Sequence, residues 1–296
     1  MSEPINLAEL YQDGRPAISF ELFPPKTDKG MKLLETNVMR LKAFRPSYFT
    51  CTYGAGGSTQ TKTLDVVERV RELTGLPVAS HLTCVGSTVA QLRDYLKEAK
   101  SRGADHIVAL RGDPPQGSTE FEAVEGGLRY ANELVDLIRG EFDRQFGIAV
   151  AGYPEVHQEA PDAQTDLENL KRKVDAGADI ITTQLFYDNA DYYRFRDACD
   201  AIGINIPIVP GLLPVTNFKQ AQKIASMCKS RIPDDLAAAM NESDEADYQF
   251  QIGVEHARRQ TVDLIENEVP GIHYYVLNKS DAARELLDGL SLGADA

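Results

Sequence analysis

The chain has 296 residues, a length that suits one α/β barrel or two ordinary domains. Its hydrophobic content of 43% and charged content of 26% are typical of a soluble globular protein. The formal net charge of −14 argues against broad contact with nucleic acid or an anionic membrane, although a local basic cluster could still hold a small anionic ligand. No apolar run approaches membrane-spanning length, and the N-terminus lacks the basic and apolar segments of a signal peptide.

Cysteine usage indicates a reducing compartment. Cys51, Cys84, Cys199 and Cys228 are widely spaced, with no Cys-x-x-Cys pair among them. We therefore expect reduced thiols and a cytoplasmic protein. Cys84 follows a predicted strand and could be reactive, but the role of a small buried hydrophobic residue is the commoner one.

The first predicted elements are a short helix over Leu7–Tyr11 and a strand over Ala17–Phe23. The strand alternates with a period of two, so its large hydrophobic residues share one face and Glu21 lies on the other. Two prolines, which cannot donate a ladder hydrogen bond, then end it. In a parallel barrel this pattern places a carboxylate at a strand end, next to an active site. A solvated glutamate of an edge strand is the competing interpretation.

Strand-like and helix-like segments then alternate along the rest of the chain. Further strands are predicted at Ser47–Thr52, Val78–Thr83, His106–Leu110, Ile148–Gly152, Ile180–Leu185, Ile206–Val209 and Ile272–Leu277. Helices are predicted at Gly30–Ala43, Thr59–Thr74, Thr88–Arg102, Val124–Gly140, Gln164–Ala176, Ala190–Ile202, Asn217–Lys229, Asp244–Asn267 and Ser280–Leu290. Repeated strand–helix units of this length predict a parallel sheet with right-handed crossovers.

The number of units predicts the fold class. About eight of them within one domain's length favour an α/β fold, a (β/α)8 TIM barrel with an extra N-terminal helix and an inserted helix before the last strand. A doubly wound sheet is the alternative, but a phosphate-binding fingerprint would then follow the first strand, where Glu21-Leu22-Phe23-Pro24-Pro25 stands. The acidic run Asn241–Glu245 is interpreted as a solvated loop. We expect residues 1–296 to form a single catalytic domain.

Polar residues gather where the predicted strands end. They include Thr52 and Tyr53, His81 and Thr83, Arg111 and Asp113, Tyr153 and His157, Gln184, and Asn278 and Lys279. Any one of them could belong to a turn, and for Asp113, which stands before two prolines, a plain turn explains the residue as well as function does. Because the carboxyl ends of parallel strands meet at one end of a barrel, their coincidence favours one shared site.

Other local motifs are weaker signals. Gly54-Ala55-Gly56-Gly57 follows a strand, but its spacing is not that of a dinucleotide fingerprint, so a flexible loop is favoured. The five histidines show no metal-ligand spacing, so we expect no metal site, and we interpret His106 and His256 as structural or surface residues. The segment Lys171-Arg172-Lys173 is either a solvated helix face or a cationic patch for a pyrophosphate.

Strings spread over nearly the whole chain, taken together, resemble the catalytic domain of the methylenetetrahydrofolate reductases. They are Ser19–Lys26, Thr52–Ser58, His81–Cys84, Ala109–Asp113, Tyr153–His157, Lys171–Ala178, Thr183–Phe186, Pro210–Pro214 and His273–Asn278. So many ordered matches are far more specific than any single motif. The resemblance implies a (β/α)8 barrel that binds FAD non-covalently, which agrees with the barrel predicted from the pattern.

The resemblance also implies an oxidoreductase of one-carbon folate metabolism, acting on CH–NH groups. NADH or NADPH would give a hydride to FAD, and 5,10-methylenetetrahydrofolate would then take it to become 5-methyltetrahydrofolate. By the same resemblance, Glu21 is the general acid that helps open the five-membered ring of the folate to an iminium ion, and Asp113 stabilises that cation. A barrel mouth can keep a carboxyl protonated by desolvation, which suits this role of Glu21. Gln184 would contact the folate, and Phe218 would stack on it.

For FAD, the resemblance implies a larger set of residues. They are Thr52, His81, Arg111, Gly112, Asp113, Tyr130, Ala131, Ala151, Tyr153, His157, Asp166, Asn169, Arg172 and Lys173. Basic and hydroxyl groups among them suit the diphosphate and ribose, and Tyr153 can cover apolar ring surface. Lys279 stands where relatives carry arginine, so it keeps the charge but loses the bidentate fork for the folate tail.

The chain ends soon after the predicted barrel, so we expect no C-terminal regulatory domain and no inhibition by adenosylmethionine. The expected partners are the folate and the nicotinamide, without nucleic acid or membrane, and bacterial relatives lead us to expect a homo-oligomer. The sequence favours neither NADH nor NADPH. Two other functions stay open: a barrel lyase or aldolase with Glu21 and Asp113 as an acid–base pair, and a non-catalytic folate- or flavin-binding protein.

Overall fold

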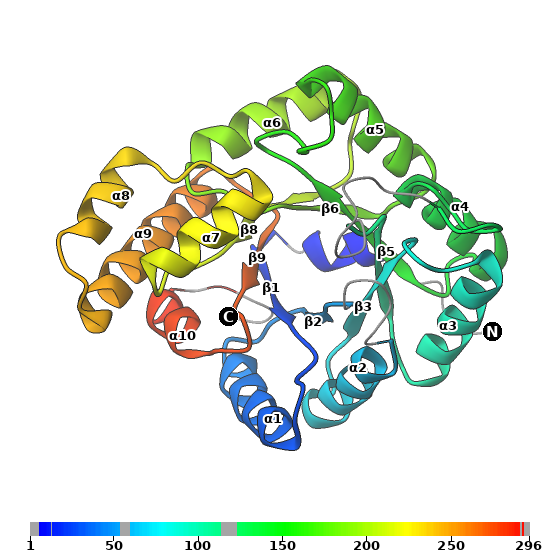
Figure 1. The fold of residues 1–296 in the computed structure, drawn as a ribbon, viewed down its shortest axis with the longest axis horizontal. Coiled ribbons are helices and arrows are strands. Elements are labelled where there is room, and N and C mark those ends of the chain that lie inside the picture. The colour runs from blue at the N-terminus through cyan, green and yellow to red at the C-terminus, as the bar shows by residue number, and fades with distance from the viewer. Residues whose placement is uncertain (1–5, 13, 54–59, 114–122, 291, 293–296) are drawn as a thin grey trace.

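The computed structural model describes residues 6–12, 14–53, 60–113, 123–290 and 292, and a ring of strands surrounded by helices dominates it (Figure 1). The strands are β1 (Ala17–Leu22), β2 (Tyr48–Cys51), β3 (Val78–Thr83), β4 (His106–Leu110), β5 (Gly147–Gly152), β6 (Ile180–Thr183), β7 (Ile208–Val209), β8 (Gly211–Leu212) and β9 (Gly271–Tyr275). All neighbouring pairs are parallel, in the order β7-β6-β5-β4-β3-β2-β1-β9-β8. The predicted α/β TIM barrel is confirmed.

The ring closes through one short stretch of chain. Pro210 separates β7, which pairs with β6, from β8, which pairs with β9. The carbonyl of Pro210 accepts a hydrogen bond from the backbone N–H of His273 at 2.9 Å. Because proline has no N–H to continue the ladder, the seventh strand of the barrel is divided into β7 and β8, and the predicted strand Ile206–Val209 includes only the first part.

The helices cover the outside of the ring. They are α1 (Asp28–Lys42), α2 (Gln60–Thr74), α3 (Val89–Ser101), α4 (Ala131–Phe142), α5 (Ala163–Asp175), α6 (Asn189–Ala201), α7 (Phe218–Cys228), α8 (Asp234–Asn241), α9 (Ala246–Glu266) and α10 (Asp281–Leu287). In the described part of the chain, α1, α3, α5, α6 and α7 begin at a side-chain cap: Thr88, for example, forms a reciprocal capping box with Gln91 at the start of α3. These caps fix the helix starts close to where the sequence predicts them.

Two helical predictions need correction. Helix α4 begins at Ala131 rather than at Val124, because Gly126 has a φ of 72° and the chain there is not yet helical. Helix α8 was not predicted at all. It follows Pro233, carries two aspartates in its first turn and buries Leu236 and Met240, which are four residues apart on one face.

Side chains fill both sides of the sheet. Outside the ring, Ile18, Phe20 and Leu22 pack into the large core beneath the helices, as the alternation of β1 predicts. Inside the ring, the 3-10 helix η1 (Leu7–Tyr11) closes the amino-terminal end of the barrel. Gly147 permits this closure, because a Cβ there would lie 2.8 Å from the Cβ of Leu7. We call this closed end the floor and the opposite end the mouth.

Two aspartates fasten the floor. Asp105, just before β4, accepts a hydrogen bond from the N–H of Val78 in β3 at 3.2 Å and pairs with an arginine of α2. Asp179, just before β6, accepts from the N–H of Ile148 in β5 at 2.7 Å and pairs with Arg139 and Arg144, each at 2.9 Å. These side chains tie the starts of neighbouring strands to each other and to the helix layer.

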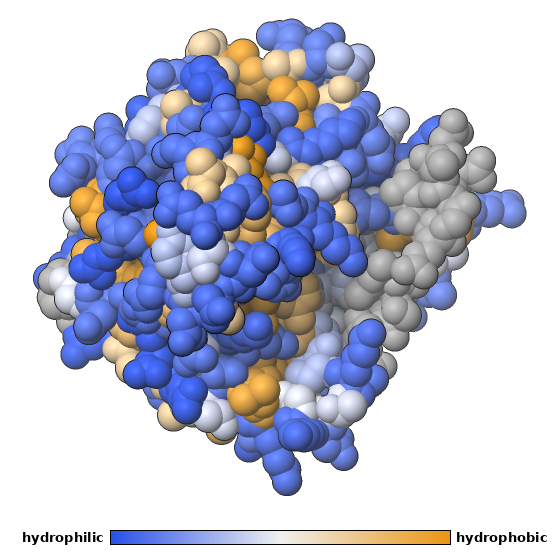
Figure 2. Space-filling model, turned by 60° about the vertical axis from the view of Figure 1, so that its left-hand side comes forward, coloured by the Kyte–Doolittle hydropathy of each residue, from blue (hydrophilic) through white to orange (hydrophobic). Residues whose placement is uncertain are grey.

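The outer surface is mostly hydrophilic on the face shown in Figure 2, with scattered apolar residues. This is usual for a globular protein. In the described part of the chain, no helix combines the length and the apolar character that crossing a bilayer requires.

Candidate active site

Two adjoining cavities open at the mouth. One, which we call the Glu21 cavity, has a volume of about 700 Å³, and the other, the basic cavity, has about 650 Å³. They share part of their lining: Leu110, Arg111, Ala151, Tyr153 and His157. Because the shared residues lie on or just after β4 and β5, the cavities form one continuous site at the carboxyl ends of the strands.

Glu21 is held in a polar cluster at the end of β1. The residue is 7% exposed, and its Oε2 lies 3.4 Å from Nε2 of His81 and 3.9 Å from Nε2 of His273. Nδ1 of His273 is in turn hydrogen-bonded to Oγ of Ser19 at 2.8 Å. Burial lowers the pKa of His81 from its ordinary 6.5, although Glu21 opposes the effect, so this imidazole is neutral at pH 7. The cluster therefore has groups that can hold or pass a proton next to the cavity.

The polar wall of the Glu21 cavity also holds side chains that the fold leaves unsatisfied. Thr50 Oγ1 and Thr83 Oγ1 are buried and have no hydrogen-bond partner among the described residues. Gly112 has a φ of 89°, and a Cβ there would lie 2.6 Å from Cγ1 of Val85, so only glycine fits this turn. Asp113 follows it, is exposed, and lines the same cavity as Glu21.

An apolar wall faces these polar groups. It includes Phe23, which is 36% exposed, and Met227 of α7, which is 65% exposed. The side-chain amide of Asn278 positions Phe23: it accepts the N–H of Phe23 at 2.7 Å and donates to its carbonyl at 2.8 Å. Exposed apolar side chains beside polar groups suit a flat ring system that carries hydrogen-bonding edges.

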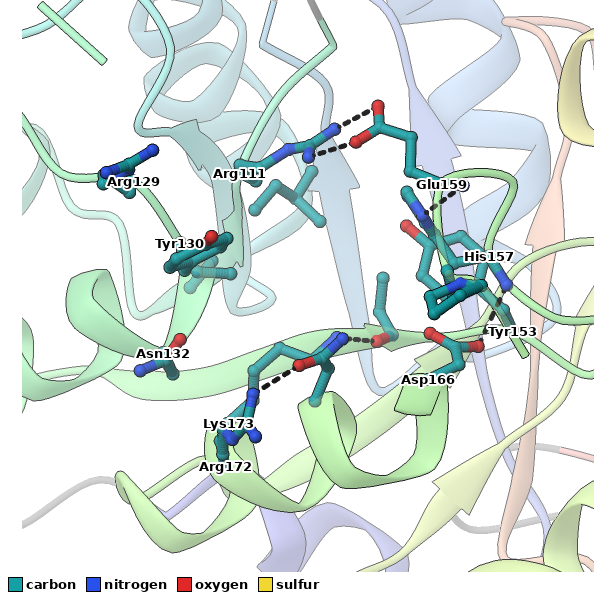
Figure 3. Close-up of a pocket in the computed structure, with 17 residues that line it drawn as sticks. Arg111, Arg129, Tyr130, Asn132, Tyr153, His157, Glu159, Asp166, Arg172 and Lys173 are labelled. Carbon is teal, nitrogen blue, oxygen red and sulfur yellow. Dashed lines mark hydrogen bonds and ion pairs between the residues drawn. The ribbon is translucent and has the colours of Figure 1, made fainter. Parts of the chain in front are cut away.

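The basic cavity is surrounded by cations and by groups that can bind hydroxyls (Figure 3). Arg111, Arg129, Arg172 and Lys173 line it, and Asp166 lies among them. In Figure 3, Arg129 lies on the opposite side of the open space from Asp166, with Arg172 and Lys173 along one edge. Four cations around such a space, in a chain with a net charge of −14, suit a ligand that carries phosphate.

Hydrogen bonds hold this lining in place. Lys173 Nζ donates to the carbonyl of Ala151 at 2.5 Å, and burial lowers its pKa to about 8. Asp166 accepts the backbone N–H of His157 at 2.9 Å, and the His157 ring packs edge-on against Tyr153 at 4.5 Å between centroids. These contacts join the loop that follows β5, which carries Tyr153 and His157, to helix α5 at the cavity wall.

Most of the predicted site residues line these cavities. Every position predicted for the cofactor lines one cavity or the other, from Thr52, His81 and Gly112 to Asn169 and Lys173, and Glu21 and Gln184 line the Glu21 cavity. Phe218 and Lys279 are not among the residues that line either cavity. Phe218 is 5% exposed and packs in the core beneath α7, whereas Lys279 is exposed.

Other lining residues were not singled out from the sequence. His273 and Tyr275 lie on the same face of β9, and their period of two was a usable signal. Arg129 and Glu159 come from loops, where no periodicity predicts the direction of a side chain. Their places in the site follow only from the folded chain.

Two of the histidines and the glycine-rich segment remain to be placed. His106 is buried at the floor, and His256 is hydrogen-bonded through Nε2 to the carbonyl of Tyr187 at 2.9 Å, so both lie apart from the two cavities. The segment Gly54–Gly57 lies outside the described residues. Within the described ranges, no three His, Cys, Asp or Glu side chains are grouped as a metal site would require.

Comparisons with known proteins agree on one family. A family model described as methylenetetrahydrofolate reductase matches residues 6–291. The 5,10-methylenetetrahydrofolate reductase of Escherichia coli (strain K12) is 42% identical over 277 residues, which cover 93% of this chain and 90% of that protein. The methylenetetrahydrofolate reductase (NADH) 1 of Arabidopsis thaliana is 39% identical over 293 residues, covering 95% and 49%. The chain thus spans about half the length of the plant relatives it matches.

Solved structures with low identity share the fold. An uncharacterized protein from Clostridium thermocellum that binds two copies of 5-methyl-5,6,7,8-tetrahydrofolic acid superposes with a TM-score of 0.61 at 14% identity, covering 92% of this chain and 93% of that one. At this identity the likeness concerns the barrel alone.

Proposed function

The chain belongs to the methylenetetrahydrofolate reductase family, and we propose that it reduces 5,10-methylenetetrahydrofolate to 5-methyltetrahydrofolate through bound FAD, with NADH or NADPH as reductant. The observation that carries this proposal is the continuity of the two cavities. A cavity with four cations opens, past Arg111 and Tyr153, into one that holds two carboxylates and an apolar wall. This arrangement suits a dinucleotide whose phosphates and ring occupy different regions of one site.

The residues present fit FAD. Arg111, Arg172 and Lys173 would hold the diphosphate, and Asp166 would accept hydrogen bonds from ribose hydroxyls. The buried hydroxyl of Thr83, which has no partner among the described residues, is free to bond to a polar ring edge. When bound, the flavin supplies the redox chemistry by accepting a hydride from the nicotinamide and passing it to the folate.

For the folate step, Glu21 is the proposed general acid. Its carboxyl lies at the end of β1, shielded from water and 3.4 Å from a neutral His81. From there it donates a proton as the five-membered ring of the folate opens to an iminium ion. Asp113, on the same cavity, stabilises the cation that develops. Gln184 orients the folate through its amide, which both donates and accepts.

The predicted contacts of Phe218 and Lys279 with the folate stay predictions, because neither residue lines the Glu21 cavity. Phe218 begins α7, whose Ile224 and Met227 line the Glu21 cavity, but its own ring is buried beneath that helix. Lys279 is exposed two residues after Leu277, which lines the cavity, so it is close enough in the chain to meet the folate tail at the rim. We also propose a cytoplasmic homo-oligomer, to be checked by light scattering on the purified protein.

Glu21→Gln tests the assignment. Because only the folate step needs the acid, we expect flavin reduction by the nicotinamide to stay within about twofold of the wild type, while folate reduction falls by about 100-fold or more. Rapid mixing under anaerobic conditions measures the two half-reactions separately. Glu72→Gln, on the exposed side of α2, makes the same chemical change away from the site and should leave both unchanged.

Two results would contradict the proposal. Equal folate reduction by Glu21→Gln and the wild type would remove Glu21 from the acid role. A purified protein that is colourless and ignores added FAD would favour the alternative of a lyase or aldolase that uses Glu21 and Asp113 as its acid–base pair. A yellow protein that the nicotinamide bleaches excludes that alternative.

A further inference from the structure

Arg111 is held by a carboxylate inside the basic cavity. Its two terminal nitrogens donate to the two carboxylate oxygens of Glu159, at 2.5 Å and 2.7 Å (Figure 3). Glu159 belongs to the loop between β5 and α5, and its backbone N–H donates to Nδ1 of His157 at 3.2 Å. Both Arg111 and Glu159 line the cavity, so this ion pair is part of the wall that a ligand meets.

The other cations of the cavity are bonded differently. Arg172 donates to the neutral amide oxygen of Asn169, and Lys173 donates to a backbone carbonyl. Within the described ranges, Arg111 is the one cation of this lining that forms an ion pair with a carboxylate. The hydrogen-bonded guanidinium holds the pKa of Glu159 below its usual range, so the carboxylate stays charged at neutral pH.

A carboxylate and a phosphate compete for the same guanidinium. The planar fork of arginine binds either anion through two parallel hydrogen bonds, and the same two nitrogens cannot serve both fully. The Glu159 side chain is 41% exposed, against 20% for Arg111, so it can turn into water at a small desolvation cost, whereas Arg111 stays in the wall. Until it turns, its negative charge also repels an incoming phosphate.

We propose that Glu159 is an internal competitor for Arg111 that weakens the binding of the cofactor's diphosphate and thereby sets the affinity of the site for FAD. The inference rests on the function proposed above and adds a residue to it. Binding then exchanges one anion for another on the guanidinium, with the Glu159 carboxylate released to water. The opposite role is that Glu159 holds Arg111 in its binding orientation, and it predicts the opposite sign for the same variant.

Glu159→Gln tests the competition, since it removes the charge and keeps the shape. Titration of the apoprotein, followed by flavin fluorescence, should give a Kd for FAD about tenfold lower than that of the wild type. The salt dependence of the Kd should become steeper, because the ligand now neutralises a cation that had an internal partner. Riboflavin, which lacks the diphosphate, should bind to both proteins with affinities within about twofold of each other.

Glu168→Gln is the matched control. Glu168 lies in α5, the helix whose Arg172 and Lys173 line the cavity, but it is exposed and is not among the lining residues. The variant changes the net charge equally and should change the Kd for FAD by less than about twofold.

The outcomes separate the two proposals. If the wild type binds FAD and Glu159→Gln binds it equally or more weakly, Glu159 is not a competitor and the proposed function is untouched. The competition is also excluded if FAD and riboflavin gain affinity equally. If the wild type binds no FAD at any salt concentration, the proposed function fails and this inference fails with it.

Discussion

The two ends of the barrel use their buried carboxylates and hydroxyls in opposite ways, whereas the ring nitrogens of His106 at the floor have no partner among the described residues and line neither cavity. At the floor, Asp105 and Asp179 each accept a strand N–H and pair with arginine, so the folded chain satisfies its own charges. At the mouth, the hydroxyls of Thr50 and Thr83 have no partner among the described residues. A buried polar group without a partner costs stability and is available to a ligand. The comparison assigns stability to the floor and binding to the mouth.

The floor also contains the same Gly-Ala-Asp segment twice. Gly103-Ala104-Asp105 and Gly177-Ala178-Asp179 each lead into a strand. In both, the glycine has a positive φ, of 85° and 114°, and its carbonyl accepts a hydrogen bond from an arginine of the helix layer, Arg71 or Arg139. The described part of the mouth has no comparable repetition, which is expected if each of its side chains serves a different part of a ligand.

The largest loss of stability is expected from Asp179→Ala at the floor. The side chain is 3% exposed, and its loss leaves the N–H of Ile148 without its acceptor and the guanidinium of Arg139, which keeps its bonds to backbone carbonyls, without its carboxylate. We expect the free energy of unfolding to fall by about 3–5 kcal/mol, as for other buried pairs from which one partner is removed. Urea unfolding near pH 7.5 measures this change. The Kd for FAD, measured at low temperature on the folded fraction, should stay within about twofold of the wild type.

Asp105→Ala removes the equivalent, less buried aspartate and should destabilise the protein less. Its side chain is 20% exposed and that of Arg71 is 44% exposed, so solvent screens the pair and can replace part of its bonding. The expected loss is about 1–2 kcal/mol. A loss larger than that of Asp179→Ala would show that burial does not rank the two aspartates.

His106 makes the floor sensitive to acid. Burial lowers its pKa from 6.5 to about 3, so the unfolded chain takes up a proton at a higher pH than the folded chain does. Stability is therefore complete above pH 6.5 and is lost as the pH falls below it, by about 2 kcal/mol between pH 7.5 and pH 5 from this group alone. His106→Leu cannot titrate and should lack that part of the loss, as urea unfolding at the two pH values would show.

Because the quantity measured is the change in the free energy of unfolding between the two pH values, any packing cost of the variant cancels. A cavity or strain introduced by leucine changes stability equally at both, so only the difference matters. An identical acid loss in the wild type and in His106→Leu would place the proton uptake elsewhere, with the buried His81 at the mouth as the next group to examine.

Much of the strand pattern, and the helix η1 that closes the floor, could be predicted from the sequence, whereas the contacts of Asp105 and Asp179 were not predicted. The bounds of η1, β3 and β4 agree with the predicted Leu7–Tyr11, Val78–Thr83 and His106–Leu110, because each is set by apolar periodicity over a short run. The split at Pro210 and the short α8 were missed. Both depend on packing around a proline, which local propensity describes poorly.

The mouth could be predicted where a strand directs the side chain. Alternation in β1 and β3 placed Glu21 and His81 inside the barrel, and both line one cavity. Glu159 lies on a loop, and its place beside Arg111 depends on contacts between separate parts of the chain. Such contacts have no local signature, so the charge balance of the basic cavity could be read only from the fold.

The smallest expected effect compares the same substitution at both ends. Thr83→Val, at the mouth, removes a hydroxyl that has no partner among the described residues. The free energy of unfolding should therefore be unchanged or rise by up to about 1 kcal/mol. The affinity for FAD or the folate should fall by about fivefold. Thr74→Val, at the floor end of α2, removes an oxygen that accepts the N–H of Leu76 at 3.1 Å, and it should cost about 1–2 kcal/mol without changing ligand affinity. Equal destabilisation by the two variants, measured by urea unfolding, would mean that the hydroxyl of Thr83 is satisfied within the fold and is not available to a ligand.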